Sequence, residues 1–477
     1  MNTTMISLCK VLFPLFLLLG LSIRMAQGEE KDSSSESLPP DFPYPKALRP
    51  QVEFWKKIFS VYSRYQTVIH DSETMQVYKV LDFRRLRDEE GLDEATISQI
   101  KQDQTKLELE LLRATLFKLQ GCVDGTESCE ALAEEEQKIW DMYKGLDDIE
   151  RFREAASEDR LRSQTGVRER FQEGVQTSRR YIKAMEEIFR REGLPVELTR
   201  LPLIESSFNL EATSKVGAAG IWQFMPSTGR IYAMRVSDMV DERRDPLIAT
   251  EAAARFLRSN YERLGSWPLA ITAYNHGPGG VATAVSTVGS SDIGDIIRNY
   301  RGRAFGFASR NFYPEFLAAV EIEKNHKKHF GTLDMEEEIT YDEVSIDHPV
   351  PLEKAASCAD TTAEELRSLN PALGDAIRAG NAAVPRGYQL RIPSGAAMAF
   401  QERYAVWQEE DRARLAALER ARKERLAALR KARASRSASI RKSRVSKTAV
   451  VRTKSGKRSS VSSVERVSDT KSRKRRG

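Results

Sequence analysis

The stretch from residue 51 to about residue 190 contains no proline, and its apolar residues recur at helical spacing. The apolar face would carry, in two successive groups, Phe54, Ile58, Tyr62, Tyr65, Leu107, Leu111, Thr115 and Leu119. Proline is strongly unfavourable inside a helix, so its absence over this length favours long helices. We therefore predict a mainly α fold, with an all-helical N-terminal region over residues 50–184.

The length of 477 residues predicts two to four domains. The four cysteines are too few for a disulfide scaffold. Cys122 and Cys129 are close in sequence, with Gly125 between them, and could pair in an oxidising compartment or stay reduced. We expect Cys358 to be a small buried residue.

The N-terminus has the pattern of an export signal. Lys10 precedes an apolar run over residues 11–23, and Ala26 and Gly28 place small residues before a cleavage site. We predict a signal peptide over residues 1–28, cleaved after Gly28, with an uncleaved anchor as the alternative. The Ser-, Pro- and Glu-rich residues 29–49 are interpreted as a linker. This pattern predicts a location in the periplasm or cell envelope.

A different helical block follows residue 185. Pro195 suits the first position of a helix that would end near Glu205. Asp245 before Pro246 predicts the capped start of a second helix. A shorter helix would then deliver Tyr274 and Asn275 to a glycine-rich loop, where glycine permits a close backbone approach.

Glu205 lies in the segment Ile204–Phe208, and two further segments supply aromatic and amide residues: residues 217–226 and residues 273–277. A carboxylic acid held neutral near pH 7 can protonate the leaving oxygen of a sugar–sugar bond, and apolar surroundings raise its pKa to that range. Most glycosidases use a second carboxylate. The spare acids nearby are not in a matching motif: Glu211, Asp241, Glu242 and Asp245.

These three segments resemble the lysozyme-like (SLT) domain of bacterial lytic transglycosylases, in particular those of the membrane-bound murein transglycosylase D type. The resemblance places this domain at residues 185–332. It implies cleavage of the bond between N-acetylmuramic acid and N-acetylglucosamine in peptidoglycan, without water. One glutamate serves first as acid and then as base, and a 1,6-anhydro ring closes on the muramic sugar.

The resemblance also implies the roles of individual residues. Glu205 falls at the position of the acid, and the residues at substrate-binding positions are Ser206, Ser214, Gln223, Met225, Tyr274, Asn275 and Tyr313. The last family motif normally has an acid a few residues before a tyrosine. The similar stretch here, residues 307–314, contains no acid, and its tyrosine is either Tyr313 or has become Phe312.

Residues 338–396 resemble a LysM module, a small α+β unit that binds N-acetylglucosamine chains. Strands are predicted at residues 343–346 and 388–393, and Thr362 with Glu365 forms a capping-box pattern. LysM modules usually have Gly-Asp-Thr where this chain has His348-Pro349-Val350.

The C-terminal part is rich in basic residues. Residues 400–436 predict a long charged helix with an 11-residue repeat, which indicates either a slight supercoil or a single solvated helix. Residues 437–477 are predicted to be disordered. From residue 440 onward there are fourteen Lys and Arg against two acids. Behind an export signal, we expect an anionic envelope polymer or lipid as partner rather than nucleic acid.

The leading hypothesis is therefore a peptidoglycan lytic transglycosylase that needs no cofactor or metal. His326 and His329 could form a metal pair, but no third ligand is apparent. Two alternatives stay open: a lysozyme-type hydrolase and a wall-binding protein without turnover.

Overall fold

The computed structural model describes the backbone of residues 40–454 and the side chains of residues 40–442. The predicted signal peptide, the first part of the predicted linker and residues 455–477 lie outside these ranges. The described chain divides into two compact units. The first comprises residues up to Val236 together with Asp241–Ile339, and the second comprises Ser237–Val240 together with the residues from Thr340 onward.

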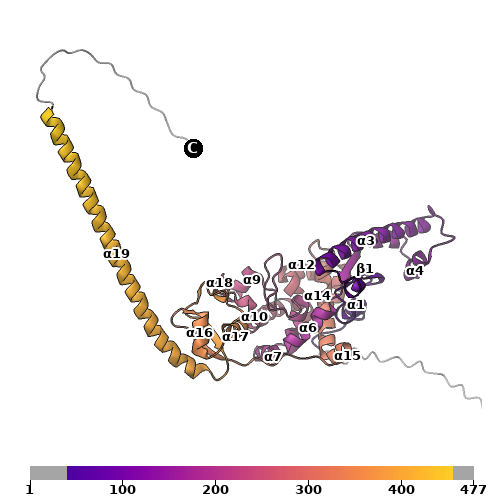
Figure 1. Ribbon diagram of the computed structural model, residues 1–477. Coiled ribbons are helices and arrows are strands. Elements are labelled where there is room, and N and C mark those ends of the chain that lie inside the picture. The colour runs from indigo at the N-terminus through magenta and orange to yellow at the C-terminus, as the bar shows by residue number, and fades with distance from the viewer. Residues whose placement is uncertain (1–39, 455–477) are drawn as a thin grey trace, which may run out of the picture. The chain divides into compact units, whose positions relative to one another are not determined.

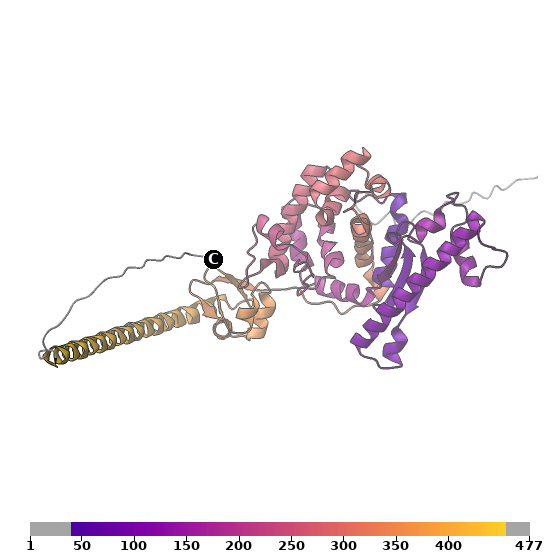
Figure 2. The same cartoon turned by 90° about the horizontal axis from the view of Figure 1, so that it is seen from above.

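The N-terminal region of the first unit contains a small antiparallel sheet, which corrects the prediction of an all-helical region. Its strands, in the order β2-β1-β3, are β1 (Gln66–Asp71), β2 (Val77–Asp82) and β3 (Leu161–Thr165). The β-branched residues of β1 favour a strand, and five of its six residues are buried. The sheet lies beside the long helix α3 (Glu94–Asp124) (Figure 2).

The other elements of this region are short or flank the sheet: η1 (Lys46–Leu48), α1 (Arg49–Ser60), α2 (Arg84–Asp88), α4 (Glu134–Met142) and α5 (Arg151–Ala155). Helix α3 starts at Asp93, whose side chain accepts a hydrogen bond from the Thr96 amide, and ends at Gly125, which has a φ of 71°. A disulfide joins Cys122 to Cys129 across this end. Cys358 is a buried free thiol.

Residues 40–49 were predicted to belong to a linker, but they pack against the first unit. Phe42 is buried and its ring lies 5.2 Å from that of Phe316, while the Pro43 carbonyl accepts a hydrogen bond from Tyr313. The buried apolar side chains of Phe42 and Leu48 explain why this segment packs against the first unit.

Helices dominate the rest of the first unit. They are α6 (Arg168–Ser178), α7 (Ile182–Arg191), η2 (Val196–Arg200), α8 (Leu201–Glu205), α9 (Pro226–Ile231), η3 (Glu242–Arg244), α10 (Pro246–Leu264), α11 (Trp267–His276), α12 (Pro278–Val288), α13 (Ile293–Asn299), α14 (Phe307–Lys324) and α15 (His326–Phe330).

Helix α14 is the central element of the first unit, because α1, α8 and α11 all pack against it. Figure 1 shows α14 next to α1. Between residues 311 and 320 every α14 side chain except Glu315 is buried. Trp55 of α1 donates a hydrogen bond to the Asn311 carboxamide over 3.0 Å. The N-terminal region and the predicted lysozyme-like domain therefore form one compact unit.

The second unit is a small α+β module followed by one long helix. It contains β4 (Asp342–Ser345), β5 (Val350–Pro351), α16 (Leu352–Ala359), α17 (Ala363–Leu369), α18 (Asp375–Arg378), β6 (Ala383–Val384), β7 (Gln389–Ile392) and α19 (Ala397–Lys454). The two predicted strands, β4 and β7, pair antiparallel, and Thr362 caps α17 as predicted.

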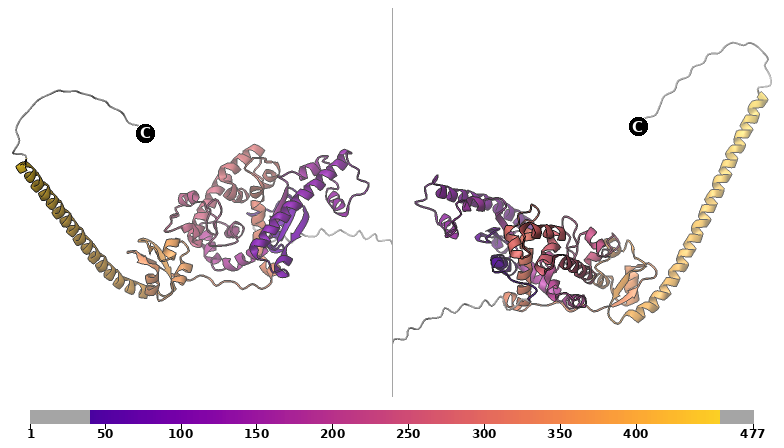
Figure 3. Two further views of the ribbon diagram at one scale, coloured as in Figure 1. Left: turned by 45° about the horizontal axis from the view of Figure 1, so that its top comes forward. Right: turned by 180° about the vertical axis from the view of Figure 1, so that it is seen from behind.

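Helix α19 is longer than the predicted helix over residues 400–436, and Figure 3 shows it unbroken in two views. Residues 397–454 contain no glycine or proline that would interrupt the backbone hydrogen bonds of this helix. Residues 437–454, predicted to be disordered, therefore belong to this helix. Among the described residues, no helix combines the length and apolar character needed to cross a membrane.

Candidate active site

Helix α8 is a short helix that ends at Glu205. Its start is fixed by Arg200, whose guanidinium pairs with Glu186 at 2.5 Å and with Glu323 of α14 at 3.3 Å. The chain then turns sharply, because Ser207 and Phe208 both adopt left-handed backbone conformations, with φ of 51° and 57°. Such conformations are costly for residues other than glycine and often mark functional sites.

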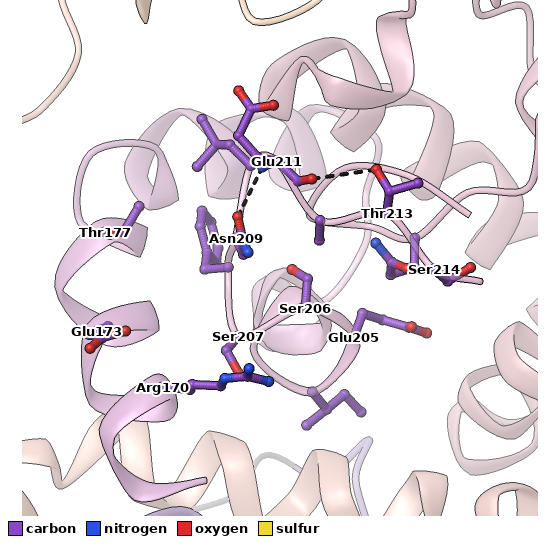
Figure 4. A pocket seen from close by; sticks show the side chains of 15 residues that line it. Arg170, Glu173, Thr177, Glu205, Ser206, Ser207, Asn209, Glu211, Thr213 and Ser214 are labelled. Carbon is purple, nitrogen blue, oxygen red and sulfur yellow. Dashed lines mark hydrogen bonds between the residues drawn. The ribbon is translucent and has the colours of Figure 1, made fainter. Parts of the chain in front are cut away.

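An open cavity of about 810 Å³ lies at this end of α8. Figure 4 shows the side chains of Glu205 and Ser206 at the helix end and those of Arg170 and Glu173 on the neighbouring α6. The cavity is lined by Arg170, Glu173, Thr177, Gln223 and all residues from Ile204 to Ser214. This space can admit a chain of polar ligand groups next to a carboxyl group.

The Glu205 carboxyl group is held without a partner. No hydrogen bond or ion pair joins its side chain to another residue in the described part of the chain. Burial alone raises the pKa of Glu205 from 4.5 to about 8. The group therefore keeps its proton at neutral pH and can donate it to a bound ligand.

Three of the predicted binding residues surround this cavity. Ser206 donates a hydrogen bond to the Ile221 carbonyl over 3.0 Å and so ties α8 to the second sequence segment. The Ser214 hydroxyl accepts a hydrogen bond from the Ala218 amide. Gln223 donates to the Gly220 carbonyl and has a φ of 49°, which turns its side chain to the cavity.

Tyr274 and Asn275 lie at the end of α11 and do not line the same cavity. The Tyr274 hydroxyl donates to the Trp222 carbonyl over 2.8 Å, and the Asn275 carboxamide oxygen accepts from Ser309 over 3.1 Å. Burial, followed by the charge of Glu205, raises the pKa of Tyr274 well above 10. Tyr274 is therefore an electrostatic neighbour of Glu205.

Two predicted binding residues occupy other surroundings. Met225 is exposed just before α9 and does not line the cavity. Tyr313 is fully buried, and its hydroxyl donates to the Pro43 carbonyl over 2.7 Å, so it does not lie at the surface of a groove. Of the two candidates for the family tyrosine, it is Phe312 whose ring stacks with that of Tyr274, at a centroid distance of 6.5 Å. Trp222 and Phe224 are core residues.

Glu315 is a second carboxyl group of this site that sequence reasoning missed. It follows Phe312 by three residues, so it lies one helical turn further on the same face of α14. Burial, followed by the charge of Glu205, raises the pKa of Glu315 well above 4.5. Glu315 directly follows the stretch 307–314 that resembles the last family motif, whereas the family pattern places the acid before the tyrosine.

The described residues contain no group of three His, Cys, Asp or Glu side chains arranged to hold a metal ion. The titratable groups described at this site are Glu205 in the open cavity, Glu315 on α14 and the partly buried Tyr274.

Two family models match separate parts of this chain. Residues 183–297 match the family of transglycosylase SLT domains, and residues 340–407 match the LysM-like domain of the lytic transglycosylase MltD. The chain thus contains an SLT domain and an MltD-type LysM-like domain.

The chain is also similar to the membrane-bound lytic murein transglycosylase D of Escherichia coli, with 34% identity over 190 residues, which are 38% of this chain and 40% of that protein. A putative tributyltin chloride resistance protein of Alteromonas is 38% identical over 99 residues, covering 20% of this chain and 48% of that one. The chain thus spans less than half the length of these relatives.

Among solved structures, the 70 kDa soluble lytic transglycosylase of Escherichia coli matches 50% of this chain and 47% of its own, with 16% identity and a TM-score of 0.26. An inactive mutant of the lytic transglycosylase Slt from Pseudomonas aeruginosa matches 32% of this chain and 25% of its own, with 20% identity and a TM-score of 0.25.

Proposed function

We propose that this protein is a lytic transglycosylase that cleaves the β-1,4 bond between N-acetylmuramic acid and N-acetylglucosamine in peptidoglycan. The observation that carries the proposal is Glu205, a carboxyl group without a bonded partner, with a pKa of about 8, in an open cavity of the SLT domain. An acid in this state holds the proton that the leaving oxygen needs.

In the proposed reaction Glu205 acts twice. Its proton passes to the glycosidic oxygen, the bond from the anomeric carbon to that oxygen breaks, and the bonding electron pair stays on the leaving oxygen. The 6-hydroxyl oxygen of the same muramic sugar then bonds to the anomeric carbon and gives its proton to the Glu205 carboxylate. No water is consumed, and Glu205 ends the cycle protonated.

Glu315 bears on the choice between this reaction and hydrolysis. A hydrolase that used Glu315 as its second acid would need this residue as a carboxylate, either to activate water or to attack the sugar. Burial and the neighbouring Glu205 both favour the protonated form of Glu315, and a protonated carboxyl group cannot act as a base. A neutral Glu315 also leaves the transient carboxylate of Glu205 free of a second negative charge, as the base step requires.

The products of wall digestion test this proposal. Mass spectrometry of muropeptides should show 1,6-anhydro ends, which are one water lighter than reducing ends. Reducing ends as the main product would establish the hydrolase alternative instead.

Glu205→Gln separates an enzyme from a wall-binding protein. The amide keeps the shape of the carboxyl group and cannot give up a proton, so kcat should fall at least about 100-fold while glycan binding is retained. Binding is measured by co-sedimentation with isolated walls, and Glu211→Gln, at the exposed rim of the same cavity, is the matched control. An unchanged rate in Glu205→Gln would remove this residue from the mechanism.

The site residues Ser206, Ser214, Gln223, Tyr274 and Asn275 are proposed to hold the glycan strand around Glu205. The cavity contacts of the first three and the coupling of Tyr274 to Glu205 support this assignment. Export to the periplasm or cell envelope, with a signal peptide cleaved after Gly28, remains part of the proposal, as does contact of the basic C-terminal residues with an anionic envelope polymer or lipid.

A further inference from the structure

A second large cavity of the first unit, of about 690 Å³, is lined by an excess of arginine. Three segments far apart in the sequence form it: the turn between β1 and β2, the loop from α5 into β3, and the loop from α13 into α14. Five guanidinium groups face three carboxylates here: Arg160, Arg162, Arg301, Arg303 and Arg310 against Glu73, Glu154 and Asp159.

Part of the arginine cluster already holds a carboxylate. Glu73 accepts contacts from Arg301 at 3.6 Å and from Arg310 at 3.5 Å. The Arg310 Nε is nevertheless buried without a hydrogen-bond acceptor. Burial, followed by the charge of the adjacent Arg301, lowers the pKa of Arg310.

Two other arginines have guanidinium groups available to a ligand. Arg303 is exposed, and no hydrogen bond or ion pair joins it to another residue within residues 40–442. Arg162 is also exposed, and its guanidinium lies over the Phe307 ring, 4.6 Å from the centroid. The cavity therefore offers charged groups above an aromatic floor made by Phe305 and Phe307.

The cavity adjoins the candidate active site through the first turn of α14. Ser309 hydrogen-bonds Asn275 and His276, whereas Phe307 and Arg310, within two residues of it, line the arginine cavity. The His276 ring also packs edge-on against Phe305, which lines the arginine cavity, with a centroid distance of 5.0 Å. A branched ligand held at Asn275 could thus place a side branch in the arginine cavity.

We propose that this cavity binds the carboxylates of the peptide attached to the glycan strand. The inference rests on the proposed function, because peptide-bearing strands carry such carboxylates beside the cleaved bond. Arginine can bind a carboxylate through two parallel hydrogen bonds, and the Glu73 carboxylate already lies within ion-pair distance of two guanidinium groups in this cavity. The N-terminal sheet thereby contributes Arg162 to substrate recognition.

The test compares three substrates: strands with their peptides, strands from which an amidase has removed the peptides, and strands whose peptide carboxylates are methyl esters. Arg303→Gln should raise KM several-fold, and Arg303→Glu about tenfold or more, for the first substrate only. Neither variant removes an ion pair of the described chain, and circular dichroism confirms the fold. Arg263→Gln, on the exposed end of α10, is the matched control and should leave all three KM values unchanged.

Equal KM changes for peptide-bearing and stripped strands, or no change for either, would overturn the carboxylate site. The same holds if the esterified strands respond to Arg303→Glu as fully as the free carboxylates do. The proposed function fails differently, since the unaltered protein would then cleave none of the three substrates.

Discussion

At the scale of single residues, the site depends on backbone conformations that ordinary side chains rarely adopt. Ser207 and Phe208 turn the chain directly behind Glu205, and the Ser207 carbonyl rests against Gly174 of α6. A Cβ atom at Gly174 would lie 2.5 Å from that carbonyl oxygen, closer than real contacts allow. The position of Glu205 thus depends on a glycine thirty-one residues earlier.

Gly174→Ala should therefore lower both stability and activity. The clash involves backbone rather than a flexible side chain, so we expect a loss of about 1–3 kcal/mol in the free energy of unfolding, together with a lower kcat. Thermal unfolding and wall digestion measure the two effects. Gly279→Ala, which meets no atom within 4 Å, is the control and should retain both properties. Full activity in Gly174→Ala would contradict the proposed support of Glu205.

The pH dependence of activity follows from the same residue. Glu205 must be protonated to start the reaction, and its pKa is about 8. We expect kcat/KM to fall as pH rises through about 8, whereas an ordinary glutamate would lose its proton near 4.5. A decline centred near about pH 5 would show that burial does not set the working state of this acid.

The raised pKa also predicts a pH-dependent difference in stability. The folded state holds the Glu205 proton up to about pH 8, and the unfolded state loses it near 4.5, so the folded protein loses stability as pH rises between these values. Glu205→Gln lacks this loss. Its unfolding temperature relative to the unaltered protein should therefore increase from pH 4.5 to pH 8 and stay level above that range, as measured by calorimetry.

At the scale of elements, helix ends were predicted best, because capping residues and glycine have well-defined roles there. Asp245 caps α10 through the amides of Leu247 and Ile248, and Gly265 ends that helix with a φ of 76°. The sheet strand β1 was missed because all but its first residue are buried. A buried strand lacks the alternation of apolar and polar residues that identifies strands, and β1 offers only two adjacent aliphatic residues, Val68 and Ile69, as a signal.

The geometry of the site could be predicted from the sequence only for residues that are close together in the chain. Glu205 and Ser206 are adjacent in sequence, and their position at a helix end follows from Pro195 and the residues after it. The electrostatic influence of Glu205 on Glu315 links helices more than one hundred residues apart. No periodicity in either helix encodes that proximity, since it depends on how α8 packs against α14.

The disulfide between Cys122 and Cys129 constrains the C-terminal end of helix α3. It closes a short loop after α3, and a loop of this size predicts a stabilisation of about 2–3 kcal/mol. Replacing both cysteines with serine should increase hydrogen exchange at the end of α3 and leave kcat unchanged. The control is the unaltered protein treated with reductant. Loss of wall digestion in the serine variant would indicate a role for this region in the reaction.

At the scale of the whole molecule, α19 is its most basic described element. A helix of 58 residues is about 87 Å long. Its exposed part has twelve Lys and Arg and two Glu between residues 412 and 442. Exposed leucines recur at the 11-residue spacing, as Leu415 with Leu418 and Leu426 with Leu429.

Removing charge from α19 should weaken retention on isolated walls. The variant replaces Arg430, Lys431, Arg433 and Arg436 with glutamine. Because salt screens exposed charges, the effect should be larger at low than at high ionic strength, as measured by co-sedimentation. Replacing Leu415, Leu418, Leu426 and Leu429 with glutamine is the control, and this variant should bind normally. If the charge variant were retained on walls as well as the unaltered protein, electrostatic attachment by α19 would be excluded.

The first turns of α19 also complete the module that precedes it. Phe400 and Tyr404 are buried in the same apolar cluster as β4 and β7, the Tyr404 hydroxyl bonds both the amide and the carbonyl of His348, and Asp411 accepts from the His348 ring at 2.9 Å. His348, one of the residues that replace the usual start of a LysM module, thus binds side chains of α19. A chain that ended after β7 would lack the two aromatic rings of Phe400 and Tyr404 from the core of this module. A fragment with the complete core and the His348 contacts must therefore include about the first four turns of α19.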